Sequence, residues 1–332
     1  MSELMAPPAR PAEVVAESVI LNDAFEDPQA LLDLMYRSAP YDLIYSKQSY
    51  ENSGGAEPWF QRSWFRGGLA VVPEARPFFE NPRLIETAKT AFGGAWEIRP
   101  HSLTANISGP MQPGRPHIDL SICRGIDDAH HPSWLRIAMH HSGLFMPWSV
   151  LQASALAYFF PGPGGGYEYW PEGPTKPSQA LRSPLWNTAI VTDNDFMYHR
   201  AQGVGPREEW LAPRTIGGDS KLHKGEDDLW HIVDEGVPRF TYKESQLRLF
   251  VIWKAYVFKT RAEAEAFDNH LDDLSMDQVW DAFADDFRRR GLSFALPDDP
   301  LHDRTFRETV LRAYPPPGLR YFTDARRPSD RY

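Results

Sequence analysis

The stretch of sequence that decides the fold is Gly114-Arg115-Pro116-His117-Ile118-Asp119-Leu120. In an extended strand, residues two apart face the same side, so His117 and Asp119 are expected to converge on one point. A second imidazole would complete a face of two histidines and one carboxylate, an arrangement that holds non-haem Fe(II) with open coordination positions. His199, 82 residues downstream (199 minus 117), is the best-placed candidate. We therefore expect a metal centre built on β-strands.

Strand-like segments surround this motif. They are short apolar runs separated by turns rich in glycine and proline, which is the pattern of an all-β domain. The runs are 96–108, 116–122, 151–160, 166–170, 188–192, 197–204 and 246–258. Strands of this number with long, uneven loops predict a double-stranded β-helix, or jelly roll, with flanking helices.

The chain divides by composition into segments of one structural unit. We expect a disordered tail over 1–16, a helical and mixed N-terminal layer over 17–95, and a jelly-roll core over 96–258. A polar insertion at 207–242 interrupts the core, and such insertions often serve as lids or binding loops. A helical extension follows over 259–332.

Helix boundaries are marked by local signals. Asp27-Pro28 and Asn81-Pro82 each pair an N-cap residue with proline at the first helical position, and Gly93-Gly94 ends the second helix. Capping boxes at Thr260–Glu263 and Ser275–Gln278 open two helices of the C-terminal extension. The sequence also predicts a helix over 133–140, inside the core.

Composition excludes several classes of protein. The 332 residues are 42% apolar, which suits one large globular unit, and no run approaches the 18 apolar residues of a membrane span. The net charge is −10 with no basic block, which argues against nucleic acid or an anionic membrane as a partner. The single cysteine, Cys123, excludes an internal disulfide and favours the reducing cytoplasm.

A charged residue occupies an otherwise apolar strand. In Gln246-Leu247-Arg248-Leu249-Phe250-Val251-Ile252-Trp253-Lys254, alternation puts Arg248 and Lys254 on one face. An arginine in such a strand is costly unless it is paired, which points to an anionic ligand. Arg200, Arg207 and, in another register, Lys254 are alternatives for this role.

Together these residues resemble the Fe(II)/2-oxoglutarate-dependent dioxygenases, broadly the phytanoyl-CoA-hydroxylase-like branch. The resemblance covers roughly 102–253. It rests on His117-x-Asp119, the runs 157–160, 165–170 and 187–193, His199 with its following residues through Val204, and Arg248. It implies Fe(II) held by His117, Asp119 and His199, 2-oxoglutarate as co-substrate with its far carboxylate on Arg248, and O₂ as oxidant.

The resemblance also implies a reaction: C–H oxidation, with hydroxylation as the default, of a small organic molecule such as one in secondary metabolism. Asp119 argues against halogenation, because halogenating members of the family have a small residue there. Asn106 resembles the asparagine that contacts the co-substrate in the nucleic-acid-dealkylating branch; a turn-forming asparagine is the alternative. Trp134, Phe145 and Trp148 are candidate substrate walls, with loop packing as their alternative. The rival functions are a non-catalytic jelly-roll binding protein and an iron oxygenase that does not use 2-oxoglutarate.

Overall fold

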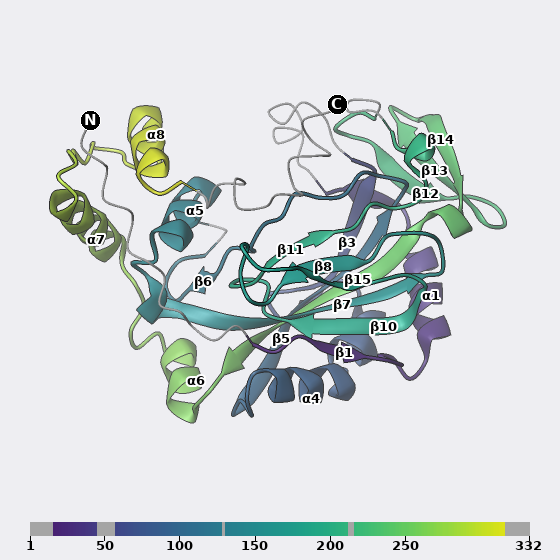
Figure 1. Ribbon diagram of the computed structural model, residues 1–332, viewed down its shortest axis with the longest axis horizontal. Coiled ribbons are helices and arrows are strands. Elements are labelled where there is room, and N and C mark those ends of the chain that lie inside the picture. The colour runs from purple at the N-terminus through teal and green to yellow at the C-terminus, as the bar shows by residue number, and fades with distance from the viewer. Residues whose placement is uncertain (1–15, 45–56, 128–129, 212–215, 316–332) are drawn as a thin grey trace.

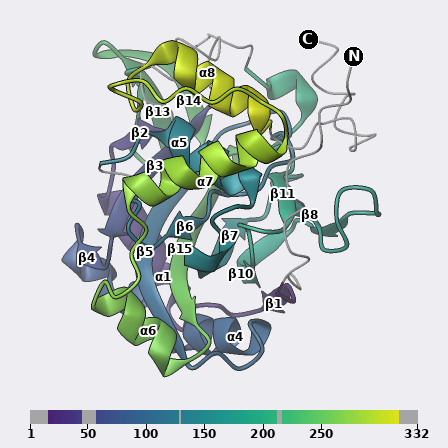
Figure 2. The same cartoon turned by 90° about the vertical axis from the view of Figure 1, so that its left-hand side faces the viewer.

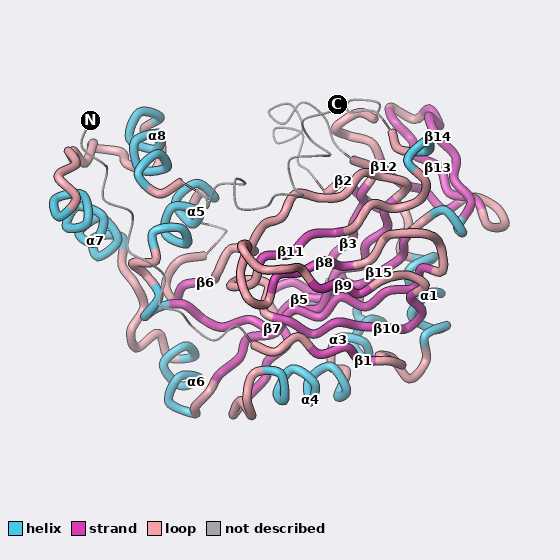
Figure 3. Tube along the Cα trace, in the orientation of Figure 1, coloured by secondary structure: helices cyan, strands magenta, loops and turns pink. Residues whose placement is uncertain are grey.

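The strands form two sheets that pack face to face. The computed structural model describes residues 16–44, 57–127, 130–211 and 216–315, so all but Ala16 of the expected tail lies outside the described residues. One sheet has twelve antiparallel strands and the other has three, in the order β11-β8-β9. Figure 3 shows the helices at the periphery of this β core. The prediction of a mostly β, double-stranded β-helix core with flanking helices is confirmed.

The long central strands set the frame of the large sheet. β15 lies between β5 and β7, and β10 continues the sheet beyond β7. These strands are β5 (Glu97–Ser108), β7 (Ser149–Phe160), β10 (Leu185–Thr192) and β15 (Arg248–Phe258). The small sheet consists of β8 (Tyr167–Trp170), β9 (Gln179–Leu181) and β11 (Tyr198–Ala201).

β15 separates two layers of the core. Leu249, Val251 and Trp253 point to the outer face and pack with the N-terminal helices. Phe250 points inward, where it packs with tyrosines of β7 and β8. The alternation predicted for this strand is therefore present, and it places Arg248 and Lys254 on the inward face.

The N-terminal layer covers the outer face of the large sheet (Figure 1). Its helices are α1 (Pro28–Arg37), α3 (Arg76–Phe79) and α4 (Pro82–Ala91). The predicted caps are present, since Asp27 accepts a hydrogen bond from Ala30 N at 2.9 Å and Asn81 accepts one from Arg83 N at 2.9 Å. Gly93, at a φ of 72°, follows α4.

The layer also contributes strands that sequence patterning did not indicate: β1 (Val19–Leu21), β2 (Tyr41–Leu43), β3 (Trp59–Arg66) and β4 (Leu69–Ala70). β1 pairs with β10, whereas β3 pairs with β5 on the other side of the sheet. The N-terminal residues thus extend the sheet in addition to covering it.

The insertion at 207–242 is folded as sheet, which differs from the binding loop that its polarity suggested. It carries β12 (Lys221–Lys224), β13 (Leu229–Asp234) and most of β14 (Val237–Lys243). β12 pairs with β2, so the insertion lengthens the large sheet at its far edge. Trp230 and Ile232 are fully buried in the main core. A few apolar residues are enough to hold these strands on the core, because they alternate with polar ones and only one face of each strand is buried.

We expect Ile232→Ala to lower the free energy of unfolding by about 2 kcal/mol or more, because it leaves a cavity in the main core. The matched control is Val237→Ala on β14, where the side chain is 48% exposed and the change should stay within about 0.5 kcal/mol. Urea unfolding midpoints of the two variants measure the difference. A shift for Ile232→Ala as small as about 0.5 kcal/mol would mean that this side chain contributes little to the stability of the core.

The C-terminal helices form a separate cluster with the helix predicted inside the core, as Figure 2 shows. The cluster consists of α5 (Ser133–Ser142), α7 (Met276–Arg289) and α8 (Arg304–Ala313). The remaining C-terminal helix, α6 (Arg261–Asp268), packs against β15. Ser275 has the full capping box, whereas only the Thr260 side chain of the other box makes its bond. Among the described helices, none is long and apolar enough to cross a membrane.

Shorter elements complete the described chain. β6 (Ile122–Cys123) adds to the edge of β7, next to the point where β10 ends. Single turns of 3-10 helix occur at Pro73–Ala75, Met146–Trp148, Arg207–Glu209 and Glu244–Gln246.

Candidate metal centre

The segment before β6 runs along β11 and places His117 beside His199. The backbones of the two histidines exchange hydrogen bonds of 3.0 and 2.9 Å, and Asp119 N donates to Asn194 O at 2.8 Å. The strand expected over 116–122 is thus an extended segment with one isolated bridge, at His117, followed by β6. This pairing brings together His117 and His199, which are 82 residues apart in the sequence (199 minus 117).

The three predicted ligands converge. Each of His117, Asp119 and His199 offers one ligand atom, and these atoms lie within 4.8 Å of one another. Asp119 Oδ1 is 3.8 Å from Nε2 of His117 and 3.7 Å from Nε2 of His199. Two imidazoles and a carboxylate on one face suit a first-row divalent metal such as Fe(II).

Backbone carbonyls orient both imidazoles. Nδ1 of His117 donates to Arg115 O at 2.9 Å, and Nδ1 of His199 donates to Met197 O at 3.0 Å. A proton on Nδ1 leaves the Nε2 lone pair free for a metal, which is the usual arrangement around ligating histidines. The ring of Tyr167 also stacks on His199, with centroids 5.5 Å apart.

The electrostatics keep His199 and Asp119 in their metal-binding forms. Burial lowers the pKa of His199 to about 4, so its imidazole is neutral at pH 7. Burial alone would raise the pKa of Asp119, but the Lys254 ammonium and the two neighbouring histidines together outweigh it, so that pKa lies well below its usual range. The His117 side chain is 55% exposed and that of His199 only 7%, so the centre opens to solvent on the His117 side.

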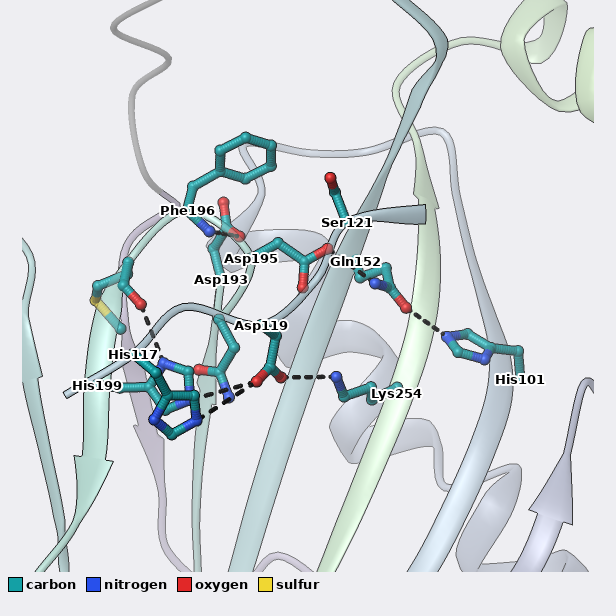
Figure 4. Close-up of polar contacts among 12 residues, drawn as sticks. His101, His117, Asp119, Ser121, Gln152, Asp193, Asp195, Phe196, His199 and Lys254 are labelled. Atoms are coloured by element: carbon teal, nitrogen blue, oxygen red, sulfur yellow. Dashed lines mark hydrogen bonds and ion pairs between the residues drawn. The ribbon is translucent and has the colours of Figure 1, made fainter. Parts of the chain in front are cut away.

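Behind Asp119 lies a polar network that sequence reasoning did not identify (Figure 4). Lys254 Nζ donates to Asp119 Oδ2 at 2.7 Å, and Gln152 Nε2 donates to Asp195 Oδ2 at 2.8 Å. Burial raises the pKa of Asp195 to about 7, and the negative charge of Asp119 adds to the effect. The sequence did place Lys254 on the same inward face as Arg248, but this position suggested a role in binding an anionic ligand and not an ion pair with Asp119.

Arg248 is buried on the inward face of β15, 1% exposed; its hydrogen-bond partners are neutral, and the Glu57 carboxylate attracts it electrostatically without a hydrogen bond between them. Its Nε donates to Ser108 Oγ at 3.0 Å and its Nη1 to Gly165 O at 3.3 Å, while Nη2 is buried without a hydrogen-bond partner. Trp59 and Phe250 place their rings 5.3 and 4.4 Å from the guanidinium carbon. Burial lowers the pKa of Arg248 to about 10, so the guanidinium remains charged at pH 7.

The other cations considered for this role are placed elsewhere. Arg200 forms an ion pair of 2.6 Å with Glu168, and Arg207 is exposed in a single turn of 3-10 helix. Lys254 is held by Asp119. Of these four cations, only Arg248 combines complete burial with an unpartnered donor.

Asn106 is fully buried on β5, opposite Phe250. Its Oδ1 accepts a hydrogen bond of 3.0 Å from Trp59 Nε1, and its Nδ2 donates to Thr104 O at 2.9 Å. Asn106 therefore orients the indole that lies beside Arg248. Its contact with a co-substrate remains a prediction.

The three predicted substrate-wall residues lie in the helical cluster. Trp134 is 8% exposed and packs edge-to-face on Phe306, and Phe145 is 2% exposed and packs on Phe283. Trp148 is partly buried against the same cluster. This placement favours the packing alternative, because the C-terminal helices cover the faces that a substrate would need. Sequence alone could not anticipate it, since these contacts span more than 130 residues.

No family model and no curated protein matches the chain. Solved structures are similar to it at low identity. An oxidoreductase of the 2OG-Fe(II) oxygenase family from Burkholderia pseudomallei is 14% identical, with a TM-score of 0.41, over 74% of this chain and 88% of that one.

Two further structures give similar values. A prolyl hydroxylase from Trichoplax adhaerens, in complex with a peptide of hypoxia inducible factor, is 10% identical with a TM-score of 0.39, over 75% of this chain and 86% of that one. HygX from Streptomyces hygroscopicus, with nickel, 2-oxoglutarate and hygromycin B bound, is 8% identical with a TM-score of 0.38, over 74% and 86%. These three structures are thus described as a member of the 2OG-Fe(II) oxygenase family, a prolyl hydroxylase and a protein with nickel and 2-oxoglutarate bound, and none of the three descriptions names the phytanoyl-CoA-hydroxylase-like branch.

Proposed function

We propose that this chain is an Fe(II)- and 2-oxoglutarate-dependent oxygenase that oxidises a C–H bond of a small organic molecule, by hydroxylation as the default outcome. The donor set supports the metal, because two oriented imidazoles and one carboxylate are the ligands that Fe(II) takes in such centres. The proposed ligands are Nε2 of His117, Nε2 of His199 and Oδ1 of Asp119.

The observation that supports 2-oxoglutarate as the co-substrate is that Nη2 of Arg248 is buried without a hydrogen-bond partner. A guanidinium is costly to bury without an anion, and its fork matches the two oxygens of a carboxylate. Phe250 and Tyr158 stack at 5.7 Å beside Arg248, and Tyr167, which stacks on His199, belongs to the same cluster. These rings form an aromatic wall that begins at the guanidinium and ends at the metal ligand His199, and we propose that the short carbon chain of 2-oxoglutarate lies along it.

Bound Fe(II) and 2-oxoglutarate would together activate O₂, with decarboxylation to succinate and CO₂. The residues of the chain bind and orient. Arg248 holds the far carboxylate, Tyr167 fixes the plane of the His199 ring, and the aromatic wall excludes water from the interior. Asp119 supplies a carboxylate where a halogenating enzyme would need space for halide, so oxygenation is the proposed outcome.

A small organic substrate would approach from the exposed side of His117. The proposal includes neither nucleic acid nor membrane as a partner, since the chain carries a net charge of −10. It keeps the cytoplasm as the location, because the one cysteine needs no oxidising environment.

The test is an anaerobic titration of 2-oxoglutarate into the Fe(II)-loaded protein, followed by admission of O₂. We expect a visible absorption band that requires both Fe(II) and 2-oxoglutarate, because the co-substrate chelates the metal, and succinate formation once O₂ is present. Failure to bind Fe(II) would favour the binding-protein alternative. Fe(II) binding with no response to 2-oxoglutarate would favour an oxygenase that takes all its electrons from its substrate.

A further inference from the structure

The two oxygens of the Asp119 carboxylate have different surroundings. Oδ1 faces Nε2 of both histidines, at 3.8 and 3.7 Å. Oδ2 accepts a hydrogen bond of 2.7 Å from Lys254 Nζ, and the side chains of this ion pair are each 24% exposed. One oxygen is therefore directed to the metal position and the other to a fixed cation (Figure 4).

Lys254 is itself held in place from behind. Its ammonium is attracted by Asp195, which is fully buried. Gln152 Nε2 donates to Asp195, and Gln152 Oε1 accepts from His101 Nε2 at 3.0 Å. The His101 ring stacks on Tyr256, with centroids 4.1 Å apart. Groups from β5, β7 and β15 thus support the cation that binds Oδ2.

We infer that Lys254 is a positioning residue that restricts Asp119 to binding the metal through Oδ1 alone. The inference rests on the proposed metal centre. A carboxylate can bind a cation through one oxygen or through both. With one oxygen, the three protein ligands of an octahedral metal leave three positions open, whereas chelation by both oxygens leaves two.

The difference matters for the proposed reaction. Bound 2-oxoglutarate would take two positions, through its keto oxygen and its C1 carboxylate, so O₂ would need the third. Lys254, by keeping Oδ2 away from the metal, preserves that third position. The two inward-facing cations of β15 thus have different roles. Lys254 binds Asp119 beside the ligands, whereas Arg248, six residues earlier in the strand (254 minus 248), keeps a donor for an anion.

The experiment counts water molecules on the metal. Mn(II) is loaded into the protein without 2-oxoglutarate, and its bound waters are counted from ¹⁷O-water relaxation. The variants are Lys254→Met, which removes the cation at similar length, and Lys254→Arg, which retains it. Lys221→Met is the matched control, because Lys221 on β12 forms an exposed ion pair of 2.9 Å with Asp42 on β2.

We expect three waters in the wild-type protein, in Lys254→Arg and in Lys221→Met, and two in Lys254→Met, where Oδ2 is released to chelate. Three waters in Lys254→Met would overturn the inference while leaving the metal centre intact. A wild-type protein that binds no Mn(II) would instead remove the proposed function on which the inference rests.

A second measurement covers the case in which Lys254→Met does not fold. In a crystal structure of the Mn(II)-loaded wild-type protein, Oδ1 of Asp119 should lie at bonding distance from the metal while Oδ2 remains on Lys254 Nζ. Both oxygens at bonding distance would overturn the inference.

Discussion

Asp119→Ala is expected to abolish metal binding and, with it, succinate formation. Asp119 supplies the one anionic ligand of the centre, with Oδ1 directed at both histidines. Loss of a residue that only supports a ligand typically costs 10- to 100-fold in metal affinity or activity, so loss of the ligand itself should exceed about 100-fold. Fe(II) titration and succinate release under saturating 2-oxoglutarate measure the two effects.

The control for this prediction is Cys123→Ser. Cys123 is buried, and burial raises the pKa of its thiol to about 12, so no reactive thiolate forms at pH 7. The Cys123→Ser variant should turn over at close to the wild-type rate. Thermal unfolding of Asp119→Ala is needed alongside, because the change also removes a partner of Lys254. Succinate release that survives in a folded Asp119→Ala variant at the wild-type rate would require a metal-independent reaction.

Arg248→Ala should raise the half-saturating concentration of 2-oxoglutarate by roughly 30-fold or more. Truncating one partner of a buried, hydrogen-bonded charge pair costs about 2–5 kcal/mol, and each 1.4 kcal/mol is about tenfold. Fe(II) affinity should change little, because Arg248 is not a ligand. Arg248→Lys should recover only part of the loss, since an ammonium replaces a two-pronged guanidinium. The measurement is a titration of 2-oxoglutarate against succinate formation.

Arg200→Ala and Arg207→Ala are the matched controls for this titration. Arg200 is bound to Glu168, and Arg207 is exposed, so neither change should shift the half-saturating concentration strongly. A large shift in either control, with none in Arg248→Ala, would mean that the far carboxylate of 2-oxoglutarate binds at that arginine and not at Arg248. The metal centre would remain unaffected by that result.

Short-range patterns in the sequence were sufficient for much of this protein. Alternation on a strand is a local property with a period of two, so it placed Arg248 and Lys254 on one face before any partner strand was known. Helix caps are local as well, and α1 and α4 begin directly after the predicted N-cap residues Asp27 and Asn81. His117 and Asp119 could be paired for the same reason.

The tertiary structure decided whatever depends on partners distant in the chain. Trp134 and Phe145 carry no mark that distinguishes a substrate wall from a helix contact, and the late helices α7 and α8 cover them. Lys254 could have bound an external anion, but the fold brings Asp119, 135 residues away in sequence, within 2.7 Å of it. A side chain's chemistry and its facing direction are properties of the local sequence. Which group it meets depends on the pairing of strands and helices far apart in the chain, and that pairing is settled by the burial of the whole core.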